Sequence, residues 1–410
     1  PSSLPTLPTS PNSKPGTILP PYSILKSSSF FKIILPKQNA NEAAIVTEVE
    51  VFGMETLQET VQFLRGKTIH HKTLINVDEL FTHQTHDFEL DFSNVQGQAH
   101  AKRAMEIAAA GAHNLIMIGP PGAGKTMLAK RISSILPPMT LQEALETTKI
   151  HSVAGKLSDK KALIAIRPFR SPHHSISAVA LIGGGSIPQP GEISLAHHGV
   201  LFLDELPEFS RHVLEVLRQP LEDRSIHISR ARWVVEFPAN FMLIASMNPC
   251  PCGFYNHPIK TCTCGSENVR KYLNKISGPL LDRIDMHVEI TPIYYEEMTS
   301  EKPTESSETI RQRVIKAVDM QKKRFEGAVN TYSNASMSSQ MVKEICQLDE
   351  ASQQLLKSAM DNLQLSARAY DRILKLARTI ADLSQSNQIE LAHVAEAITY
   401  RNLDRENWAG

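Results

Sequence analysis

The chain has 410 residues, of which 41% are hydrophobic and 21% charged, so its length allows two or three domains with a substantial core. Its 43 basic and 43 acidic residues cancel, which excludes a globally basic nucleic-acid binder and leaves local patches for any contact with DNA. No apolar run reaches the roughly 20 residues of a membrane helix, no secretory leader is visible, and the few cysteines do not suggest a disulfide scaffold, so we expect a cytoplasmic protein.

The first part of the chain changes character near residue 30. Residues 1–30 are rich in Pro and Ser and are expected to be disordered, because such a composition cannot bury a core. In residues 31–66, FKIILP predicts a strand, and ETLQETVQFLRG predicts an amphipathic helix that ends at Gly66. This segment is only a fragment of a domain, and residues 67–90, which show no clear pattern, are expected to be a linker.

From residue 91 to about 295 the pattern predicts an α/β core. Short, nearly all-apolar runs of this kind are typical of central strands that are buried on both faces of a parallel sheet. They are NLIMIG at 114–119, GVLFLDE at 199–205 and FMLIASMN at 241–248. Residues 296–410 instead predict a series of helices with short breaks, and therefore an all-α second domain.

GPPGAGKT at 119–126 fits the pattern G-x-x-x-x-G-K-[ST], and it follows a predicted strand and opens a predicted helix. Glycines let backbone N–H groups wrap a phosphate, and the helix N-terminus adds positive potential. The predicted ATP-binding loop comprises Gly119, Pro120, Pro121, Gly122, Ala123, Gly124, Lys125 and Thr126. Lys125 is expected to reach the β- and γ-phosphates and Thr126 to ligate Mg²⁺. A Gly-rich turn without function is the alternative, which the flanking strand and helix disfavour.

Two predicted strands end in polar residues that suit ATP hydrolysis. In LFLDE, Asp204 is expected to hold Mg²⁺, and Glu205 to polarise the water that attacks the γ-phosphate. The alternative is that these are two solvated acids at a strand end, but the presence of a phosphate loop in the same chain disfavours it. Asn248 ends the next apolar strand and can orient the same water, or it is a turn-forming residue before Pro249.

Arginines in two later segments are candidates for further phosphate contacts. Arg283 precedes a predicted strand and can reach the γ-phosphate of a neighbouring subunit, although an ion pair with Asp282 or Asp285 is the alternative. Arg368 lies at a predicted helix start and suits a second phosphate contact, with a plain surface arginine as the alternative. The basic run within residues 311–324 is expected to be a solvated helix face.

Four of the five cysteines form two Cys-x-Cys pairs at 250–264. They are Cys250, Cys252, Cys262 and Cys264. Four thiolates can close a tetrahedral structural zinc site, although this spacing is tighter than the usual C-x₂₋₄-C, and His257 can substitute for one ligand. Reduced thiols in a surface loop are the alternative.

Three longer stretches narrow the interpretation to one family. They are RPFRSPHHSISAVALIGGGSIPQPGEISLAHHGVLFLDELPEF at 167–209, ASMNPCPCGFY at 245–255 and ISGPLLDRIDMHVEI at 276–290. With these stretches the chain closely resembles the magnesium-chelatase-like AAA+ ATPases of the YifB/ComM (competence protein M) type. The resemblance implies a ring, expected to be a hexamer, that hydrolyses ATP while moving on DNA. It also implies a helicase role, branch migration of recombination intermediates in natural transformation.

The resemblance also assigns roles to single residues. It implies that Asn248 is the first sensor, Arg283 the arginine finger and Arg368 the second sensor. It places the segment Val95, Gln96 and Gly97 near the adenine. Members of the family begin with a complete Lon-protease-like domain, of which residues 31–66 resemble only the last portion. We therefore expect an α+β Lon-like remnant, an AAA+ P-loop core with a parallel sheet at 91–295, and an all-α lid at 296–410.

The resemblance implies that two arginine-containing segments face the pore of the ring, and both are candidate DNA contacts. One is RPFRSPHH, with Arg167 and Arg170, and the other is the predicted hairpin SIHISRARWVVEF, with Arg230, Arg232 and Trp233 at its turn. Arginines suit phosphates and a tryptophan can stack on a base, whereas local ion pairs or packing are the alternative. Two other functions stay open: an ATPase that remodels a protein partner, and a nucleotide-gated binding module with weak hydrolysis.

Overall fold

The computed structural model forms two compact units, residues 1–86 with 139–166 and residues 87–138 with 167–410. The residues that it describes are 31–44, 49–74, 90–157, 163–230, 233–255, 257, 259–292, 304–328 and 331–401. The predicted disordered segment 1–30 and most of the predicted linker 67–90 lie outside them. Within the described ranges, no helix has both the length and the apolar character that a bilayer crossing requires.

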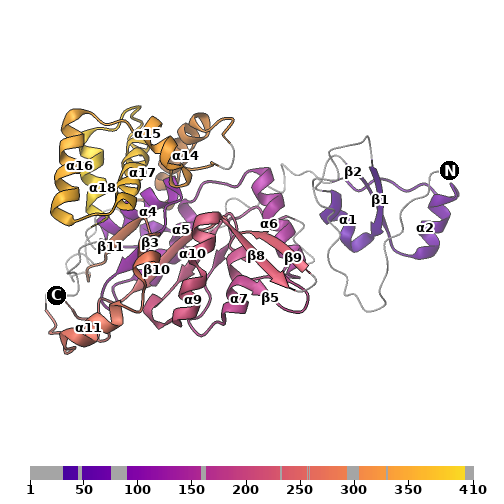
Figure 1. The fold of residues 1–410 in the computed structure, drawn as a ribbon. Helices are drawn as coiled ribbons and strands as arrows, with labels where there is room; N and C mark the ends of the chain where they lie inside the picture. The colour runs from indigo at the N-terminus through magenta and orange to yellow at the C-terminus, as the bar shows by residue number, and fades with distance from the viewer. Residues whose placement is uncertain are drawn as a thin grey trace. The chain divides into compact units, whose positions relative to one another are not determined.

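The first unit contains a small β-α-β motif (Figure 1). Strands β1 (Phe31–Pro36) and β2 (Val49–Met54) pair in parallel, and helix α1 (Lys37–Ala44) connects them. Parallel neighbours need such a crossover connection. The motif buries a small apolar core made of Leu35, Ala40, Ala43 and Val51.

This unit also contains two helices that begin at capping boxes. Helix α2 (Leu57–Leu64) begins at a capping box, in which Thr56 accepts from the backbone N–H of Glu59 and Glu59 accepts from that of Thr56. Gly66 follows with a φ of 69°, a left-handed conformation that ends helices. Helix α6 (Leu141–Val153) starts at a second capping box.

The second unit is built on a five-stranded parallel sheet in the order β11-β3-β10-β7-β4. Its strands are β3 (Leu115–Ile118), β4 (Phe169–Arg170), β7 (Val200–Leu203), β10 (Met242–Met247) and β11 (Met286–Glu289). Figure 1 labels the strands β3, β10 and β11. Every residue of β3, β7 and β10 is buried, which confirms the three central strands that the apolar runs predict. The α/β fold with a P-loop-like core is therefore confirmed.

Helices cover both faces of this sheet, because alternate residues of each strand point to opposite faces. Leu115 and Met117 of β3 join a core that includes helices α4 (Ala99–Gly111) and α5 (Lys125–Ile135). Ile116 of the same strand joins the core on the other face. Further elements of this unit are η2 (Phe92–Asn94), α7 (Ala178–Ile182), β5 (Gly183–Gly184), β6 (Gln189–Pro190), α8 (Glu192–Leu195), η3 (Leu206–Glu208), α9 (Arg211–Val216), α10 (Arg218–Asp223), β8 (Ser225–Arg230), β9 (Trp233–Pro238), α11 (Ser266–Leu273) and α12 (Gly278–Leu281).

The C-terminal region is helical, as predicted, and it packs on α4 through α14 and α17. Its elements are α14 (Ser307–Arg324), η4 (Asn334–Ser336), α15 (Ser339–Ile345), α16 (Glu350–Leu363), α17 (Ala367–Leu383) and α18 (Leu391–Thr399). Ser306, Ser338, Asp349 and Ser366 cap helices α14, α15, α16 and α17 through their side chains. The domain boundaries near 91 and 295 stay a prediction.

The basic run in α14 is only partly the expected solvated face, because Lys316, Lys322 and Lys323 are exposed but the arginines are not. Arg311 is buried, Arg313 pairs with Glu106 of α4, and Arg324 pairs with the fully buried Asp382. The sequence pattern could not show this, because the acidic partners lie on other helices. Arg313 and Arg324 therefore join α14 to other helices.

Candidate active site and metal centre

The segment 119–124 joins the buried strand β3 to helix α5 in the strand–turn–helix arrangement that a phosphate loop requires. Gly122 and Gly124 have φ values of 80° and 88°, which side chains rarely adopt. At Gly119 an added Cβ would lie 2.3 Å from the carbonyl oxygen of Ile290. The glycines therefore permit a tight loop whose backbone meets an anion at the N-terminus of α5.

Lys125 is buried at the start of α5, and its ammonium is fixed by oxygen atoms around it. Its Nζ donates to the carbonyl oxygens of Gly119 at 2.6 Å and Pro120 at 2.9 Å. It also donates to Oδ1 of Asn248 at 3.0 Å, so the ends of β3 and β10 meet at this lysine. Burial lowers the pKa of Lys125, and the carboxylate charges of Asp204 and Glu205 act against that shift.

Asp204 follows β7 and lies directly beside the phosphate loop. The hydroxyl of Thr126 donates to its Oδ2 at 2.7 Å, and the hydroxyl of Ser246 on β10 donates to its Oδ1. Hydroxyl and carboxylate oxygens are the ligands that Mg²⁺ prefers. Thr126 and Asp204 thus fit the ion that accompanies ATP.

Glu205 has an unusual backbone conformation, with φ 53° and ψ 51°. A left-handed non-glycine residue costs about 1–3 kcal/mol and is frequent at functional sites. Its backbone N–H donates to Oδ1 of Asp204 at 3.1 Å, and its carboxylate lies 3.9 Å from Nδ1 of His174. The carboxylate of Glu205 is exposed, so it is open to solvent next to the buried end of β7.

The segment expected near the adenine is linked to the phosphate loop through the residues that follow β11. Val95 is fully buried, and its carbonyl accepts from Nζ of Lys102 at 2.5 Å. Gln96 is half-buried, and Gly97 is left-handed with a φ of 60°. The side chain of Gln98 donates to the carbonyl oxygen of Thr291 at 2.7 Å, one residue after the Ile290 that touches Gly119.

Arg283 lies at the opposite end of the sheet from the phosphate loop. Strand β11 pairs in parallel with β3, Met286 is opposite Leu115, and Asn114 binds the carbonyl oxygen of Arg283 at 3.1 Å. The phosphate loop follows the other end of β3, so the length of a four-residue strand, about 13 Å, separates the two. Nη2 of Arg283 pairs with Oε1 of Glu222 at 2.5 Å, and not with the two aspartates that the sequence offered.

Arg368 and Arg372 lie at the same end as Arg283. Nη1 of Arg368 is 3.6 Å from Oδ2 of Asp282, and Arg372 pairs with the buried Asp285. Burial alone would raise the pKa of Asp285, but the charge of Arg372 and a hydrogen bond from the backbone N–H of Asn114 hold it well below its usual range. The structure therefore brings Arg283 and Arg368 to one edge, away from the phosphate loop of their own chain.

The candidate DNA-contacting arginines either have partners within this chain or lie outside the described residues. Nε of Arg167 donates to the carbonyl oxygen of Pro137 at 2.7 Å, and Arg170 makes a bidentate pair with Glu192 at 2.6 and 2.8 Å. Strands β8 and β9 form the predicted hairpin, with Arg230 opposite Trp233. Arg232 and the side chains of Arg230 and Trp233 lie outside the described residues. The DNA contacts stay a prediction.

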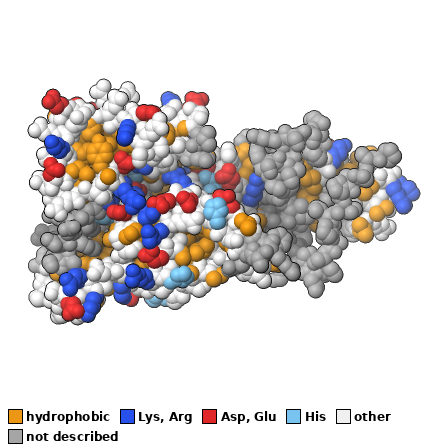
Figure 2. Space-filling view, viewed as in Figure 1, with side chains coloured by type: hydrophobic (Ala, Val, Ile, Leu, Met, Phe, Trp, Pro, Cys, Tyr) orange, Lys and Arg blue, Asp and Glu red, His pale blue; other side chains and the backbone are white. Residues whose placement is uncertain are grey.

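The distribution of charge on the surface is mixed, with no large basic region among the described residues on the face drawn in Figure 2. Figure 2 shows Lys and Arg side chains interspersed with Asp and Glu across the middle of the face drawn, as the zero net charge would suggest. Any attraction of DNA to such a face has to come from small groups of arginines and lysines.

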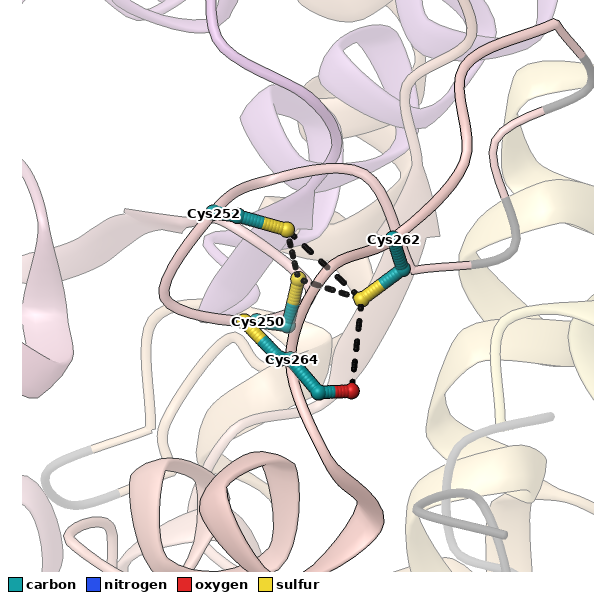
Figure 3. A group of neighbouring side chains, drawn as sticks. All are labelled: Cys250, Cys252, Cys262 and Cys264. Carbon is teal, nitrogen blue, oxygen red and sulfur yellow. Dashed lines mark hydrogen bonds between the residues drawn. The ribbon is translucent and has the colours of Figure 1, made fainter.

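The four clustered cysteines lie in the loop between β10 and α11, and their side chains converge (Figure 3). Sγ of Cys250 is 3.4 Å from that of Cys252 and 3.7 Å from that of Cys262, and the Cys252–Cys262 separation is 3.6 Å. Zinc–sulfur bonds of about 2.3 Å in a tetrahedron place sulfurs about 3.8 Å apart. All four sulfurs, with Cys264, lie within 4.8 Å of one another, so the group can hold zinc.

His257, which the sequence offered as a substitute ligand, is not in this group. Its Nδ1 accepts from the backbone N–H groups of Ile259 and Lys260 at 3.1 and 3.0 Å. Hydrogen bonds from the backbone N–H groups of Phe254 and Thr263 lower the pKa of Cys252 to about 5, whereas burial and the neighbouring thiols raise the pKa of Cys262 to about 12. A thiolate is the form that binds a metal.

Two functional candidates were not identified from the sequence. Ser246 had a signal, because the period of a strand places it on the same face as Asn248 and it is polar in an apolar run. No sequence signal pointed to Glu222, because its partner Arg283 lies far along the chain.

A phosphate loop between β3 and α5, beside the acidic end of β7, defines the P-loop class of nucleotide-binding folds. Comparison with known families narrows this class. The family "Magnesium chelatase, subunit ChlI" matches residues 91–298, and its C-terminal family matches residues 304–401. The chain is 45% identical to competence protein ComM of Haemophilus influenzae over 94% of this chain and 74% of that protein. It is 44% identical to YifB of Escherichia coli over 95% of this chain and 74% of that protein.

The chain therefore belongs to the YifB/ComM branch of the magnesium-chelatase-like AAA+ ATPase family. A more distant similarity links it to the magnesium-chelatase 38 kDa subunit of Cereibacter sphaeroides, at 23% identity over 38% of this chain and 52% of that subunit.

Proposed function

We propose that this chain is an ATP-hydrolysing, ring-forming AAA+ motor that acts on DNA. The observation that carries the proposal is the separation of two half-sites. Lys125, Thr126 and Asp204 meet at one end of the sheet, and Arg283 lies at the other. A neighbouring copy can bring its Arg283 to this phosphate loop, and repeated head-to-tail contacts of this kind close into a ring, here proposed to be a hexamer.

The proposed roles rest on the contacts described above and on the family resemblance. Lys125 binds the β- and γ-phosphates, and Asn248 and Glu205 position and polarise the attacking water, with Glu205 accepting its proton. Thr126 and Asp204 would hold Mg²⁺, which neutralises phosphate charge. Arg283 and Arg368 of the neighbouring copy contact the phosphates. Val95, Gln96 and Gly97 lie on the adenine side.

DNA is the proposed substrate because one close relative is named a competence protein, and because arginine-bearing segments suit phosphates. The hairpin residues Arg230, Arg232 and Trp233 are the first candidates for the contact, and the loop with Arg170 is the second. We propose that the motor works in the cytoplasm and promotes branch migration of recombination intermediates during natural transformation.

A second candidate function is an ATPase that remodels a protein partner. The match of residues 91–298 to a magnesium chelatase subunit favours it, because this family includes chelatase components. It predicts that ATP turnover depends on a partner protein and not on DNA.

The deciding experiment is steady-state ATP hydrolysis with and without single-stranded and branched DNA, at low and moderate salt. Stimulation that weakens as salt rises is expected, because phosphate contacts release counterions. Arg230→Ala and Trp233→Ala should reduce the stimulation, whereas Lys271→Ala on α11, an exposed basic residue paired with Glu267, should not. Turnover that ignores DNA in an assembled protein would favour the partner-remodelling function.

The cysteine cluster is proposed to hold a structural zinc ion. Its donors are four thiols at distances that suit a tetrahedron, and protein ligands would fill every position. Purified protein is expected to contain one zinc per chain, measured by elemental analysis, and the double substitution of Cys262 and Cys264 by serine should remove it.

A further inference from the structure

The loop that carries the cysteine cluster also touches the phosphate loop. Gly253 follows Cys252, and its φ of 83° is left-handed. An added Cβ at Gly253 would lie 2.4 Å from Cδ of Pro121, which is inside the phosphate loop. Real Cβ atoms do not tolerate such a distance, so the backbone at Gly253 packs against Pro121 with no room for a side chain.

The same loop makes a second contact with the ATP site at its start. Oδ1 of Asn248 accepts a hydrogen bond of 3.0 Å from Nζ of Lys125. One residue separates Asn248 from Cys250. Cys250 is fully buried, in the same hydrophobic core as Ile116 of β3. The backbone N–H of Gly253 donates back to the carbonyl of Cys250 at 3.0 Å, which closes a turn around the first Cys-x-Cys pair.

The two contacts with the phosphate loop therefore flank the first pair of thiols. Residues 248–253 read NPCPCG, with one contact at each end and Cys250 and Cys252 between them. The second pair of thiols, Cys262 and Cys264, comes just before helix α11. A metal that joins the pairs would fix the short segment on which Lys125 and Pro121 rest.

We propose that the cysteine loop is a metal-dependent positioning element for the phosphate loop, so that zinc occupancy of its four thiolates sets the rate of ATP turnover. Cys250, Cys252, Cys262 and Cys264 act through Asn248 and Gly253, and none of the thiols contacts the reacting phosphates. The inference rests on the proposed ATP hydrolysis and adds a requirement for bound metal. A misplacement of about 1 Å in a reacting geometry costs about 100-fold in rate, so we expect losses of about 10- to 100-fold.

The test compares the full chain with the double variant Cys262→Ser/Cys264→Ser and with Cys346→Ser, which removes the cysteine outside the cluster. Zinc content, the dissociation constant of a fluorescent ATP analogue, and kcat are measured for each. The double variant should lose zinc and lose about 10- to 100-fold in kcat. Cys346→Ser should keep both. Treating the wild type with a zinc-selective chelator in excess Mg²⁺ should lower kcat, and added zinc should restore it in the wild type alone.

A further variant separates the contact from the fold of the loop. Gly253→Ala keeps all four thiols, so it should retain zinc while kcat falls, because its Cβ displaces Pro121. The inference is overturned if zinc-free, assembled protein turns over ATP at the wild-type rate, if the purified protein holds no zinc, or if Gly253→Ala retains full kcat. A zinc-loaded wild type without ATP hydrolysis would instead refute the proposed function.

Discussion

The two ends of the parallel sheet differ in how their polar side chains are held. At the carboxyl end, Lys125 of α5 contacts Asn248 after β10, and Thr126 of α5 contacts Asp204 after β7. At the amino end, Arg283 and Arg368 each contact an acidic residue that lies outside the phosphate loop. One end thus presents an assembled site for a phosphate, and the other presents cations held in position by acids.

This difference indicates how one chain can serve two sites. A finger that precedes β11 cannot reach a phosphate beyond the far end of β3, since the strand between them is about 13 Å long. The arginine end of one copy and the phosphate end of the next are complementary in charge to the same triphosphate. The chain is therefore expected to be active only when copies stack head to tail.

The largest expected effect comes from the arginine end. Arg283→Ala should lower kcat about 1,000-fold or more, because an arginine supplied by a neighbour stabilises the charge of the transition state. ATP binding to the isolated chain should not change, because Arg283 lies far from its own phosphate loop. Equilibrium binding of an ATP analogue and steady-state turnover check the two halves of this expectation, and weakened binding to the monomer would contradict it.

The next largest effect is expected at the phosphate end. Glu205→Gln should reduce ATP turnover about 100- to 10,000-fold while binding is retained, because the amide cannot accept the proton of the attacking water. Rapid-quench measurement of a single turnover distinguishes slow chemistry from slow product release. A variant that hydrolyses ATP near the wild-type rate would remove the assigned role of Glu205.

A stability effect tests how rigidly the arginine end is anchored. Asp285 is buried and paired with Arg372, so Asp285→Asn should lower the free energy of unfolding by about 3 kcal/mol. The control Asp282→Asn, at a partly exposed pair with Arg368, should cost less than about 1 kcal/mol. Urea unfolding measures both, and equal losses would contradict the difference between the two pairs.

The Asp285 pair also predicts a pH dependence. Because its pKa is lowered in the folded chain, Asp285 contributes stability above the ordinary aspartate pKa of 3.8. That contribution is lost as pH falls below that value towards the folded-state pKa. The difference in unfolding free energy between the wild type and Asp285→Asn should therefore be full at pH 7 and shrink below about pH 4. A difference that grows in acid would be contrary to the assigned shift.

The smallest effect is expected at Glu222, which orients the guanidinium of Arg283 from a half-exposed position. Glu222→Gln should lower kcat about 2- to 5-fold, the range of one exposed ion pair. Glu215→Gln, at the neighbouring pair with Arg218, is the matched control and should leave kcat unchanged. Identical rates for both variants would mean that Glu222 does not position Arg283.

Much of the fold could be predicted from local patterns. Buried strands β3, β7 and β10 read as apolar runs, and the helical C-terminal region followed from its periodicity. The edge strand β4 has only two residues, Phe169 and Arg170, so it gives no run to detect. The strand order β11-β3-β10-β7-β4 depends on contacts between distant segments, which local patterns do not show.

In the candidate site, too, some contacts could be predicted from local motifs and others could not. The contact of Thr126 with Asp204 could be anticipated, because the ends of parallel strands meet at one edge and both residues sit in local motifs. The partners of Arg283 and Arg170 could not, since Glu222 and Glu192 carry no motif. The contact of Gly253 with Pro121 depends on a backbone conformation that the letters NPCPCG do not reveal.

The most direct test of a site shared between copies is to mix two inactive variants. Lys125→Ala removes the phosphate end and Arg283→Ala removes the arginine end, so each alone should be inactive. Random assembly of an equal mixture joins an intact phosphate end to an intact arginine end at about one quarter of the interfaces. We predict that ATP hydrolysis reappears at up to about a quarter of the wild-type rate. A mixture that demonstrably co-assembles and stays inactive would contradict the shared site.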